Sequence, residues 1–197
     1  MPRREVQLCA GEYYHLYNRG NNRERIFYER ENYSFFLRRV WKYLVPVLEI
    51  IAYCLMPTHY HLLIRVKTSE VSENLGGLGA SKAMMKFAVS YTKAMNKRYD
   101  RVGALFQGAF KAKHIAENSY LVHLSRYIHL NPVMVGLAKR PKDWEFSSYR
   151  ECIGLRDGAL PNPEIVMSQF PSPEAYREFV GSYTPREREI IADLLFD

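Results

Sequence analysis

Two histidines stand one residue apart in an apolar stretch, CLMPTHYHLLIRV at residues 54–66. In a β-strand, residues i and i+2 point to the same face, so His59 and His61 are expected to project side by side. Two neighbouring neutral imidazoles can bind one divalent metal ion. The alternative is a pair of partly exposed histidines with ordinary hydrogen bonds, and the spacing alone does not exclude it.

A second segment, SYLVHLSRYIHLNP at residues 119–132, carries a tyrosine and an asparagine four positions apart. On a helix, Tyr127 and Asn131 share a face, beside an apolar stripe that would pack on a sheet. The amide oxygen of Asn131 is a candidate third metal ligand, and a phenol beside a metal-bound phosphate is a candidate nucleophile. Alternatively, Tyr127 is a helix tyrosine at the edge of the core. His123, one turn earlier, would either tune the site or be exposed.

These two segments are part of a set of landmarks that resembles the HUH-type single-tyrosine transposases of the insertion-sequence group. The resemblance is greatest to the branch associated with repetitive extragenic palindromes (REPs). The landmarks follow the family's order: YHLYNRG (14–20), MPTHYHLLI (56–64), GALFQGAFKA (103–112), YLVHLSRYIHLNPV (120–133) and DWEFSSYREC (143–152), with SQFPSPEAYREFV (168–180) similar to its usual tail. Two positions depart from the family: Ala109 often is arginine there, and Met134 often is basic.

The resemblance implies an α+β fold like the RRM or ferredoxin-like sandwich, with a mainly antiparallel sheet that carries the His-x-His strand. It also implies metal-dependent cleavage and strand transfer of single-stranded DNA, at hairpin-forming palindromes. By position, His59, His61 and Asn131 would bind Mg²⁺ or Mn²⁺, and Tyr127 would form a 5′-phosphotyrosine. Two alternatives remain: a non-catalytic binding module for single-stranded nucleic acid on the same fold, and a replication-initiator or relaxase relative.

The elements that must position these residues follow from hydrophobic periodicity and turn signals. The pattern predicts a strand at 13–19, a helix at 32–45, a hairpin of 47–55 with 59–66, a helix at 81–99, a strand at 110–116 and a helix at 119–130. We expect the last of these helices to end at Asn131-Pro132. The strands are short and one connection is a hairpin, which favours an α+β sandwich over a doubly wound sheet.

The remaining segments are connections and a tail. Residues 72–80, SENLGGLGA, read as a flexible loop; no Gly-Lys-Ser/Thr follows, which argues against a phosphate loop. We assign residues 1–154 to the transposase/nuclease domain and 155–197 to an accessory C-terminal helical segment. In that segment, Ser172 and Thr184 each precede a proline as helix caps, and Glu187 would complete a capping box with Thr184.

The formal charge of +7 favours a polyanionic partner, with nucleic acid foremost, although many small basic proteins bind none. Four lysines fall within an arc of ~60° on the predicted helix 81–99, which suits a phosphate backbone: Lys82, Lys86, Lys93 and Lys97. A solvated face is the alternative, and a membrane-surface helix is disfavoured because the opposite face resembles core packing. Further candidate DNA contacts are Arg19, Arg23 and Arg25 among tyrosines, and the pair Lys111 and Lys113.

Other features concern the compartment and the partners. No apolar stretch is long enough to span a bilayer, and the N-terminus lacks the apolar segment of a signal peptide. Cys9, Cys54 and Cys152 are odd in number and form no metal-binding pattern, which is typical of a reducing cytoplasm. We therefore expect a cytoplasmic, nucleoid-associated protein that binds single-stranded DNA, not membranes, and that could form a homodimer.

Overall fold

The computed structural model describes residues 6–68 and 76–194, with a four-stranded antiparallel sheet at its centre. The strands are β1 (Tyr13–Arg19), β2 (Leu48–Met56), β3 (His59–Val66) and β4 (Lys111–Ile115), in the spatial order β2-β3-β1-β4. Helix α1 (Arg30–Tyr43) connects β1 to β2, and α3 (Gly76–Arg98) connects β3 to β4. This βαββαβ order is the ferredoxin-like arrangement, so the predicted α+β fold is confirmed.

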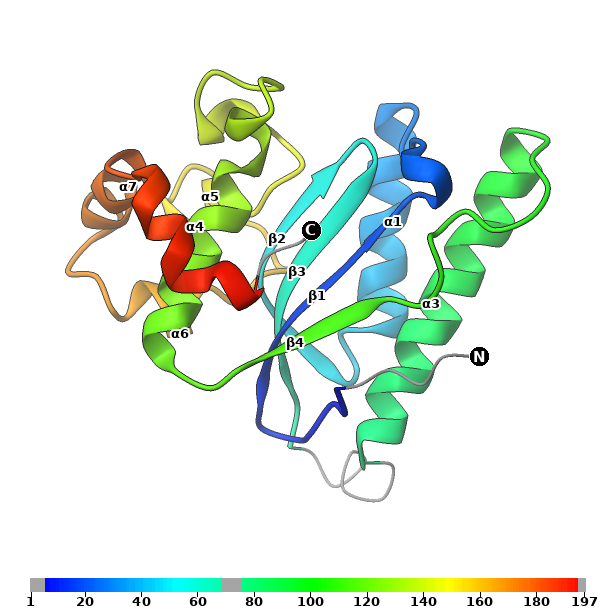
Figure 1. Cartoon of the computed structure of the whole chain (residues 1–197), viewed down its shortest axis with the longest axis horizontal. Coiled ribbons are helices and arrows are strands. Elements are labelled where there is room, and N and C mark those ends of the chain that lie inside the picture. The colour runs from blue at the N-terminus through cyan, green and yellow to red at the C-terminus, as the bar shows by residue number, and fades with distance from the viewer. Residues whose placement is uncertain (1–5, 69–75, 195–197) are drawn as a thin grey trace.

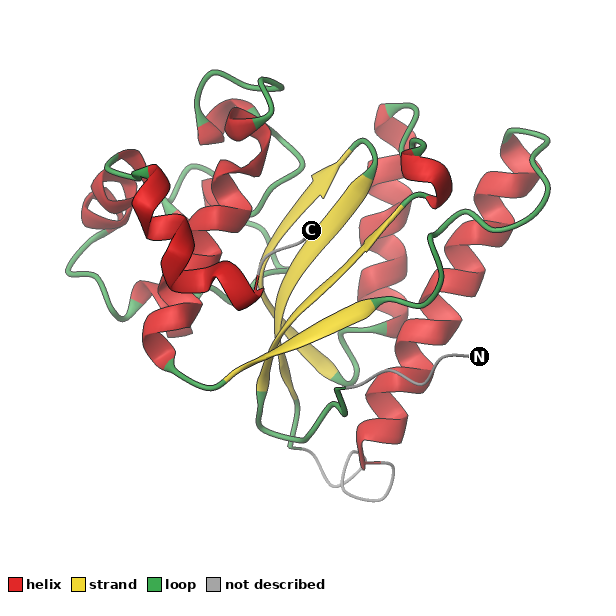
Figure 2. Ribbon diagram, viewed as in Figure 1, coloured by secondary structure: helices red, strands yellow, loops and turns green. Residues whose placement is uncertain are grey.

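Helices cover both faces of the sheet (Figure 1, Figure 2). Helices α1 and α3 lie on one face, and α4 (Asn118–Met134) lies on the other. Around α4 pack α5 (Tyr149–Cys152), α6 (Glu164–Met167), α7 (Pro173–Gly181) and the 3-10 segment η3 (Pro185–Leu194). Two short 3-10 turns, η1 (Asn21–Arg23) and η2 (Pro141–Asp143), follow β1 and precede α5. None of the helices in the described ranges is both long and apolar enough to cross a membrane.

Alternation along the strands separates two cores. On β3, Tyr60, Leu62 and Ile64 belong to the core under α1 and α3. His61 and Leu63, on the same strand, face α4, because neighbouring residues point to opposite faces. The sheet therefore has an α1/α3 face and an α4 face, and the paired histidines belong to the α4 face.

The glycine-rich segment before α3 differs from the expectation. Residues 76–80, predicted to be loop, form the first turn and a half of the helix, while residues 72–75 of the predicted loop lie outside the described residues. Helical glycine costs about 1 kcal/mol relative to alanine. Ala80 and Met84 are buried against the sheet, and this packing offsets the propensity.

The prediction that a helix ends at Asn131-Pro132 is also wrong, because α4 continues to Met134 with Pro132 inside it. Proline removes one backbone donor and disfavours the helical conformation of the preceding residue. Here Pro132 is buried and only two helical residues follow it, so one missing bond is outweighed by packing.

The predicted caps in the C-terminal segment are present in part. The Ser172 hydroxyl accepts from the backbone N–H of Ala175 at 3.3 Å, as an N-cap does. Oε2 of Glu187 accepts from the backbone N–H of Thr184 at 2.7 Å, but the Thr184 hydroxyl also donates to this carboxylate instead of capping the backbone. Only half of the capping box of Thr184 and Glu187 is therefore formed, and the segment that follows Thr184 is a 3-10 helix.

Candidate active site

The paired histidines lie at the start of β3, directly after the two-residue turn of Pro57 and Thr58. Their ring centroids are 5.0 Å apart and the ring planes are nearly perpendicular. His61 is fully buried and His59 is half-buried. The strand therefore places two imidazoles side by side under α4, with one of them nearer to solvent.

A neighbouring side chain engages Nδ1 of each imidazole. Nδ1 of His59 shares a hydrogen bond with the Thr58 hydroxyl at 3.0 Å, and Nδ1 of His61 shares one with Nε2 of His15 at 2.9 Å. Such bonds orient a histidine ring and select its tautomer. A cation at this site would consequently be bound through the Nε2 atoms.

Helix α4 brings the asparagine and the tyrosine to the histidines. The side chain of Asn131 lies close enough to both imidazoles to influence the pKa of each, and its Nδ2 donates to the Tyr127 carbonyl at 3.1 Å. The Nδ2 bond directs the amide oxygen toward the rings. The ring of Tyr127 meets that of His61 edge to face, with centroids 5.8 Å apart. All four predicted catalytic and metal-binding residues therefore converge in one place.

Burial determines the charge state of this cluster. Desolvation, with smaller effects from neighbouring groups, lowers the pKa of His59 to about 4 and holds the pKa of His61 well below its usual value. Both rings are neutral at pH 7, which is the form that binds metal ions.

The donor set fits a divalent ion shared with a substrate. In the ranges that the structure describes, no three His, Cys, Asp or Glu side chains come together in a way that could hold a metal. The cluster offers two imidazoles and one amide oxygen, so a substrate phosphate or water would complete the coordination shell. Open positions of this kind are typical of catalytic metal sites.

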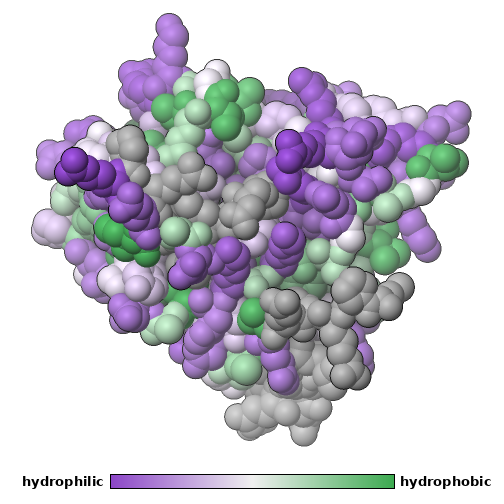
Figure 3. All heavy atoms as spheres, in the orientation of Figure 1, coloured by the Kyte–Doolittle hydropathy of each residue, from purple (hydrophilic) through white to green (hydrophobic). Residues whose placement is uncertain are grey.

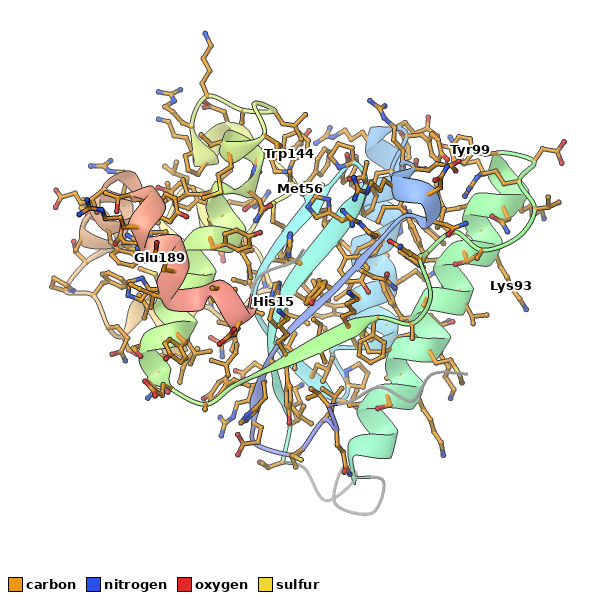
Figure 4. All side chains as sticks on the ribbon, in the orientation of Figure 1. His15, Met56, Lys93, Tyr99, Trp144 and Glu189 are labelled. Carbon is orange, nitrogen blue, oxygen red and sulfur yellow. The ribbon has the colours of Figure 1, made fainter. Side chains whose placement is uncertain are left out.

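His15, which is fully buried on β1, also belongs to this cluster and was not predicted from the sequence (Figure 4). In the β1–β3 register, Tyr17 lies opposite His61, and His15 lies diagonally to His61 on the same face. The rings of His15 and His61 are stacked with centroids 5.1 Å apart. Alternation within YHLYNRG indicates the face of His15, but only the register between strands brings it to His61.

A second missed group anchors α4 to its surroundings. His129 is fully buried, and its Nδ1 and Nε2 lie 2.7 Å from the Tyr176 hydroxyl and 2.9 Å from the Ser148 hydroxyl. Oγ of Ser148 accepts from the backbone N–H of Tyr53 on β2 at 2.8 Å. His129 is two residues from both Tyr127 and Asn131. The network therefore fixes the position of α4, the helix that carries both site residues, relative to β2 and α7.

The C-terminal segment contacts α4 at Arg126, a residue of α4 that directly precedes Tyr127 and has a buried side chain. Its guanidinium donates to Glu187 at 2.6 Å and to the Phe179 carbonyl at 3.1 Å, and it stacks on the Phe179 ring at 3.9 Å. His123 bonds to this guanidinium at 3.0 Å and contacts Phe179. His123 therefore belongs to the Arg126 cluster, and the structure does not bring it to the paired histidines.

The predicted basic residues of the sheet lie on the site side. Arg19 is paired with His59 in the β1–β3 register, while Arg23 and Arg25 are exposed just beyond it. Lys111 and Lys113, on the edge strand β4, pair with Tyr17 and His15 of β1. The two lysines therefore point to the α4 face.

The structure places the predicted lysine row elsewhere. Its members, Lys82, Lys86, Lys93 and Lys97, are exposed on the outer side of α3, and Figure 4 shows Lys93 projecting away from the sheet. Because α3 covers the α1/α3 face, the sheet separates this row from the histidines. Its role in binding DNA stays a prediction.

A solved structure shares the fold of this chain. A solved REP-associated tyrosine transposase, bound to a REP hairpin, has a TM-score of 0.61 to this chain at 18% identity, covering 82% of this chain and 97% of its own. At that identity, the likeness shows the fold. A candidate transposase from Deinococcus radiodurans R1, also 18% identical, covers 65% of this chain and 95% of its own with a TM-score of 0.35. No curated protein matches this chain.

The family match covers the whole cluster. The family described as IS200-like transposase matches residues 10–131, which is more than half of the chain. The match runs from β1 to Asn131 and so includes the paired histidines and Tyr127. The chain belongs to the IS200-like transposase family.

Proposed function

We propose that this protein is a REP-associated, metal-dependent single-stranded DNA endonuclease and strand transferase. The observation that carries the proposal is the convergence of His59, His61 and Asn131 beside the ring of Tyr127. The structural relative bound to a REP hairpin supports hairpin-forming palindromic DNA as the substrate. Membership of the transposase family supports strand transfer after cleavage.

In the proposed reaction, Tyr127 is the nucleophile. Its phenolic oxygen forms a bond to the scissile phosphorus while the bond from phosphorus to the 3′ oxygen breaks. The phenolic proton is lost to solvent, and the leaving oxygen takes up a proton to give a 3′-hydroxyl. The 5′-phosphotyrosine retains the phosphodiester's energy, so a second 3′-hydroxyl can displace Tyr127 and join new strands without a nucleotide cofactor.

His59, His61 and Asn131 would hold a divalent cation, Mg²⁺ or Mn²⁺. When bound, such an ion offsets the negative charge that develops on the phosphate oxygens. Thr58 and His15 hold the two rings in place through their Nδ1 atoms. Asn131 links the ring pair to the tyrosine's own helix turn, so the nucleophile and the ligands are positioned together.

We further propose how DNA reaches this cluster. Arg19, Lys111 and Lys113 lie on the site face and would contact phosphates flanking the scissile bond. The lysine row of α3 would contact DNA outside that segment, because it lies behind the sheet.

All three cysteines are free, which agrees with the reducing compartment expected from the sequence. A homodimer remains a proposal.

Covalent trapping tests the reaction. The protein is incubated with Mn²⁺ and labelled single strands, both random and hairpin-containing, and label on the protein is read in a denaturing gel. We expect an adduct that is lost in Tyr127→Phe, in His59→Ala and with EDTA. Lys42→Glu, on the far side of the molecule, should form the adduct normally.

Other outcomes would change the assignment. An adduct that survives Tyr127→Phe would move the nucleophile to another residue. Tight strand binding without an adduct, in protein with confirmed metal loading, would favour the non-catalytic binding module. That module also predicts binding that survives chelation.

A further inference from the structure

A hollow of about 670 Å³ lies on the outer side of α4, between this helix, α5, α7 and residues 139–142. Apolar side chains make up much of its lining; we call four of them, Leu130, Val133, Ile153 and Val180, the floor, and the first and last of these are buried. Protein sites for small organic ligands have volumes of roughly 300–1,000 Å³ and mostly apolar linings. The hollow therefore has the size and floor of a ligand site.

The hollow is separate from the catalytic cluster. Leu130 lines it, whereas the next residue, Asn131, faces the histidines. Consecutive residues of a helix point about 100° apart, so α4 stands between the two sites. None of the predicted metal ligands lines the hollow.

Positive charge surrounds the opening. Lys139, Arg140, Lys142 and Arg177 all line it. Arg140 is paired with Asp143 at 3.0 Å, but among the residues described here the other three have no carboxylate at ion-pair distance. Nε of Arg150 donates to the Lys142 carbonyl at 2.8 Å, which holds this part of the rim in place. Arg177 also lies near Glu174, yet the four cations outnumber the one carboxylate in the lining, so the rim keeps a net positive charge beside an apolar floor, which matches an anion with a flat apolar body.

The apolar surface continues outward from the hollow. Met134 and Leu155 line it and are 44% and 61% exposed, and Val135 and Leu137 are exposed close by in sequence. Figure 3 shows a group of hydrophobic side chains where Figure 1 shows the loop after α4. An unpaired base offers its whole π-face to such a surface, whereas bases in a duplex are already stacked.

From these features, we propose that the hollow holds one unpaired nucleotide of the DNA strand, with the base on the floor and the phosphate at the rim. This inference rests on the proposed function, because it makes the hollow a second subsite for the same strand. Glu174 favours a base over a lipid tail as the occupant. Its carboxylate lies at the rim and would accept hydrogen bonds from base amino or imino groups, which a hydrocarbon chain lacks.

The test combines strand affinity with photocrosslinking. Fluorescence anisotropy measures binding of a labelled pool of random single strands to the full chain. A parallel pool contains 5-iodo-2′-deoxycytidine, and crosslinked peptides are identified by mass spectrometry. The variants are Ile153→Trp, which fills the hollow, and Arg177→Glu, an exposed position that should not disturb folding. Lys42→Glu is the matched charge reversal away from the hollow, and thermal unfolding checks every variant.

We expect both hollow variants to weaken strand binding about tenfold, the range of one lost base-stacking contact, with little change for Lys42→Glu. Crosslinks should map to the Tyr149 or Tyr183 peptide and vanish in Ile153→Trp. Unchanged affinity in both variants, with a normal Tyr127 adduct, would overturn this inference and leave the proposed function intact. Weakened binding without any wild-type adduct would support the hollow and reject the catalytic proposal. A wild-type protein that binds no strand would reject both.

Discussion

The two faces of the sheet carry different chemistry although the same four strands build both. Under α1 and α3, the core is dominated by packed rings: Phe27 and Tyr33 are stacked at 4.2 Å, and Phe36 meets Phe87 edge to face at 4.8 Å. Under α4, an apolar core also contains four fully buried side chains that carry polar or charged groups: His15, His61, Arg126 and His129.

This contrast shows which face of the sheet contains buried polar groups despite their energetic cost. A buried polar group destabilises a protein unless it is hydrogen-bonded. On the α4 face such bonds are made at 2.6–2.9 Å by His15 with His61, Arg126 with Glu187, and His129 with Tyr176. Local departures from an apolar core are typical of functional sites. We infer that the α1/α3 face mainly stabilises the sheet, while the α4 face holds the chemistry.

The sharpest contrast between the faces comes from one substitution made on each. Tyr127→Phe should lower the yield of DNA adduct at least about a thousandfold, because the proposed nucleophile is removed. Tyr91→Phe, on the other face, removes a hydroxyl that donates to the Ile26 carbonyl at 2.7 Å. It should keep the adduct and lower the free energy of unfolding by about 1 kcal/mol. Denaturing gels and urea unfolding measure both; equal adduct loss in the two variants would contradict the division between faces.

The α1/α3 face should show the largest effect on stability. Phe36 is fully buried and touches the rings of Phe27, Tyr60, Phe87 and Tyr91. Phe36→Ala should lower the free energy of unfolding by about 3–5 kcal/mol, since it leaves a cavity. Phe36→Leu is the milder variant if the alanine protein does not fold. Adduct yield per folded molecule should stay at the wild-type level, and its loss in a folded variant would show that this face also shapes the site.

Metal affinity should depend on a residue that does not itself bind the ion. His15→Phe keeps a ring of similar size but removes the partner of His61 Nδ1. Loss of such an outer partner typically weakens metal binding by about 10–100-fold. Titration of Mn²⁺ followed by EPR measures this. His114→Phe is the matched control, because His114 is exposed on β4 and pairs with Glu12. Equal affinities in the two variants would argue against the role of His15.

A modest effect on stability that depends on pH is expected in the C-terminal segment. A hydrogen bond from Arg126 lowers the pKa of Glu187. A carboxyl group whose pKa is lower in the folded state stabilises the protein at pH values above its unfolded-state pKa. This stabilisation is lost as the pH falls through the folded-state pKa. Glu187→Gln should therefore reduce the free energy of unfolding by about 1–2 kcal/mol at pH 7, allowing for partial exposure.

The pH dependence supplies the control for this substitution. The difference between wild type and Glu187→Gln should shrink as the pH drops below the ordinary carboxyl range, when both side chains are uncharged. Glu29→Gln serves as a matched variant on the other face, where the carboxylate is bonded to Tyr99 and Arg98 at the surface. Urea unfolding at neutral and acidic pH measures each. A difference that is independent of pH would mean that Glu187 acts through packing, not through its charge.

Sequence reasoning located most elements because their signals are local. The predicted strand 13–19 coincides with β1, and the hairpin around Pro57 and Thr58 has nearly the predicted bounds. It failed where packing opposed local propensity: the glycines at the start of α3 are helical, and α4 continues past Pro132. In both places buried contacts outweigh a cost of one hydrogen bond or of backbone entropy.

The pairs of site residues that lie within one element follow from the sequence alone. His59 and His61 share a face because strands repeat every two residues, and Tyr127 and Asn131 share one because helices repeat every 3.6. Tertiary packing brings these two faces together, adds His15 from β1, and places the lysines of α3 behind the sheet. Those relations depend on strand register and on which face each helix covers, and both are set by contacts between residues far apart in the chain.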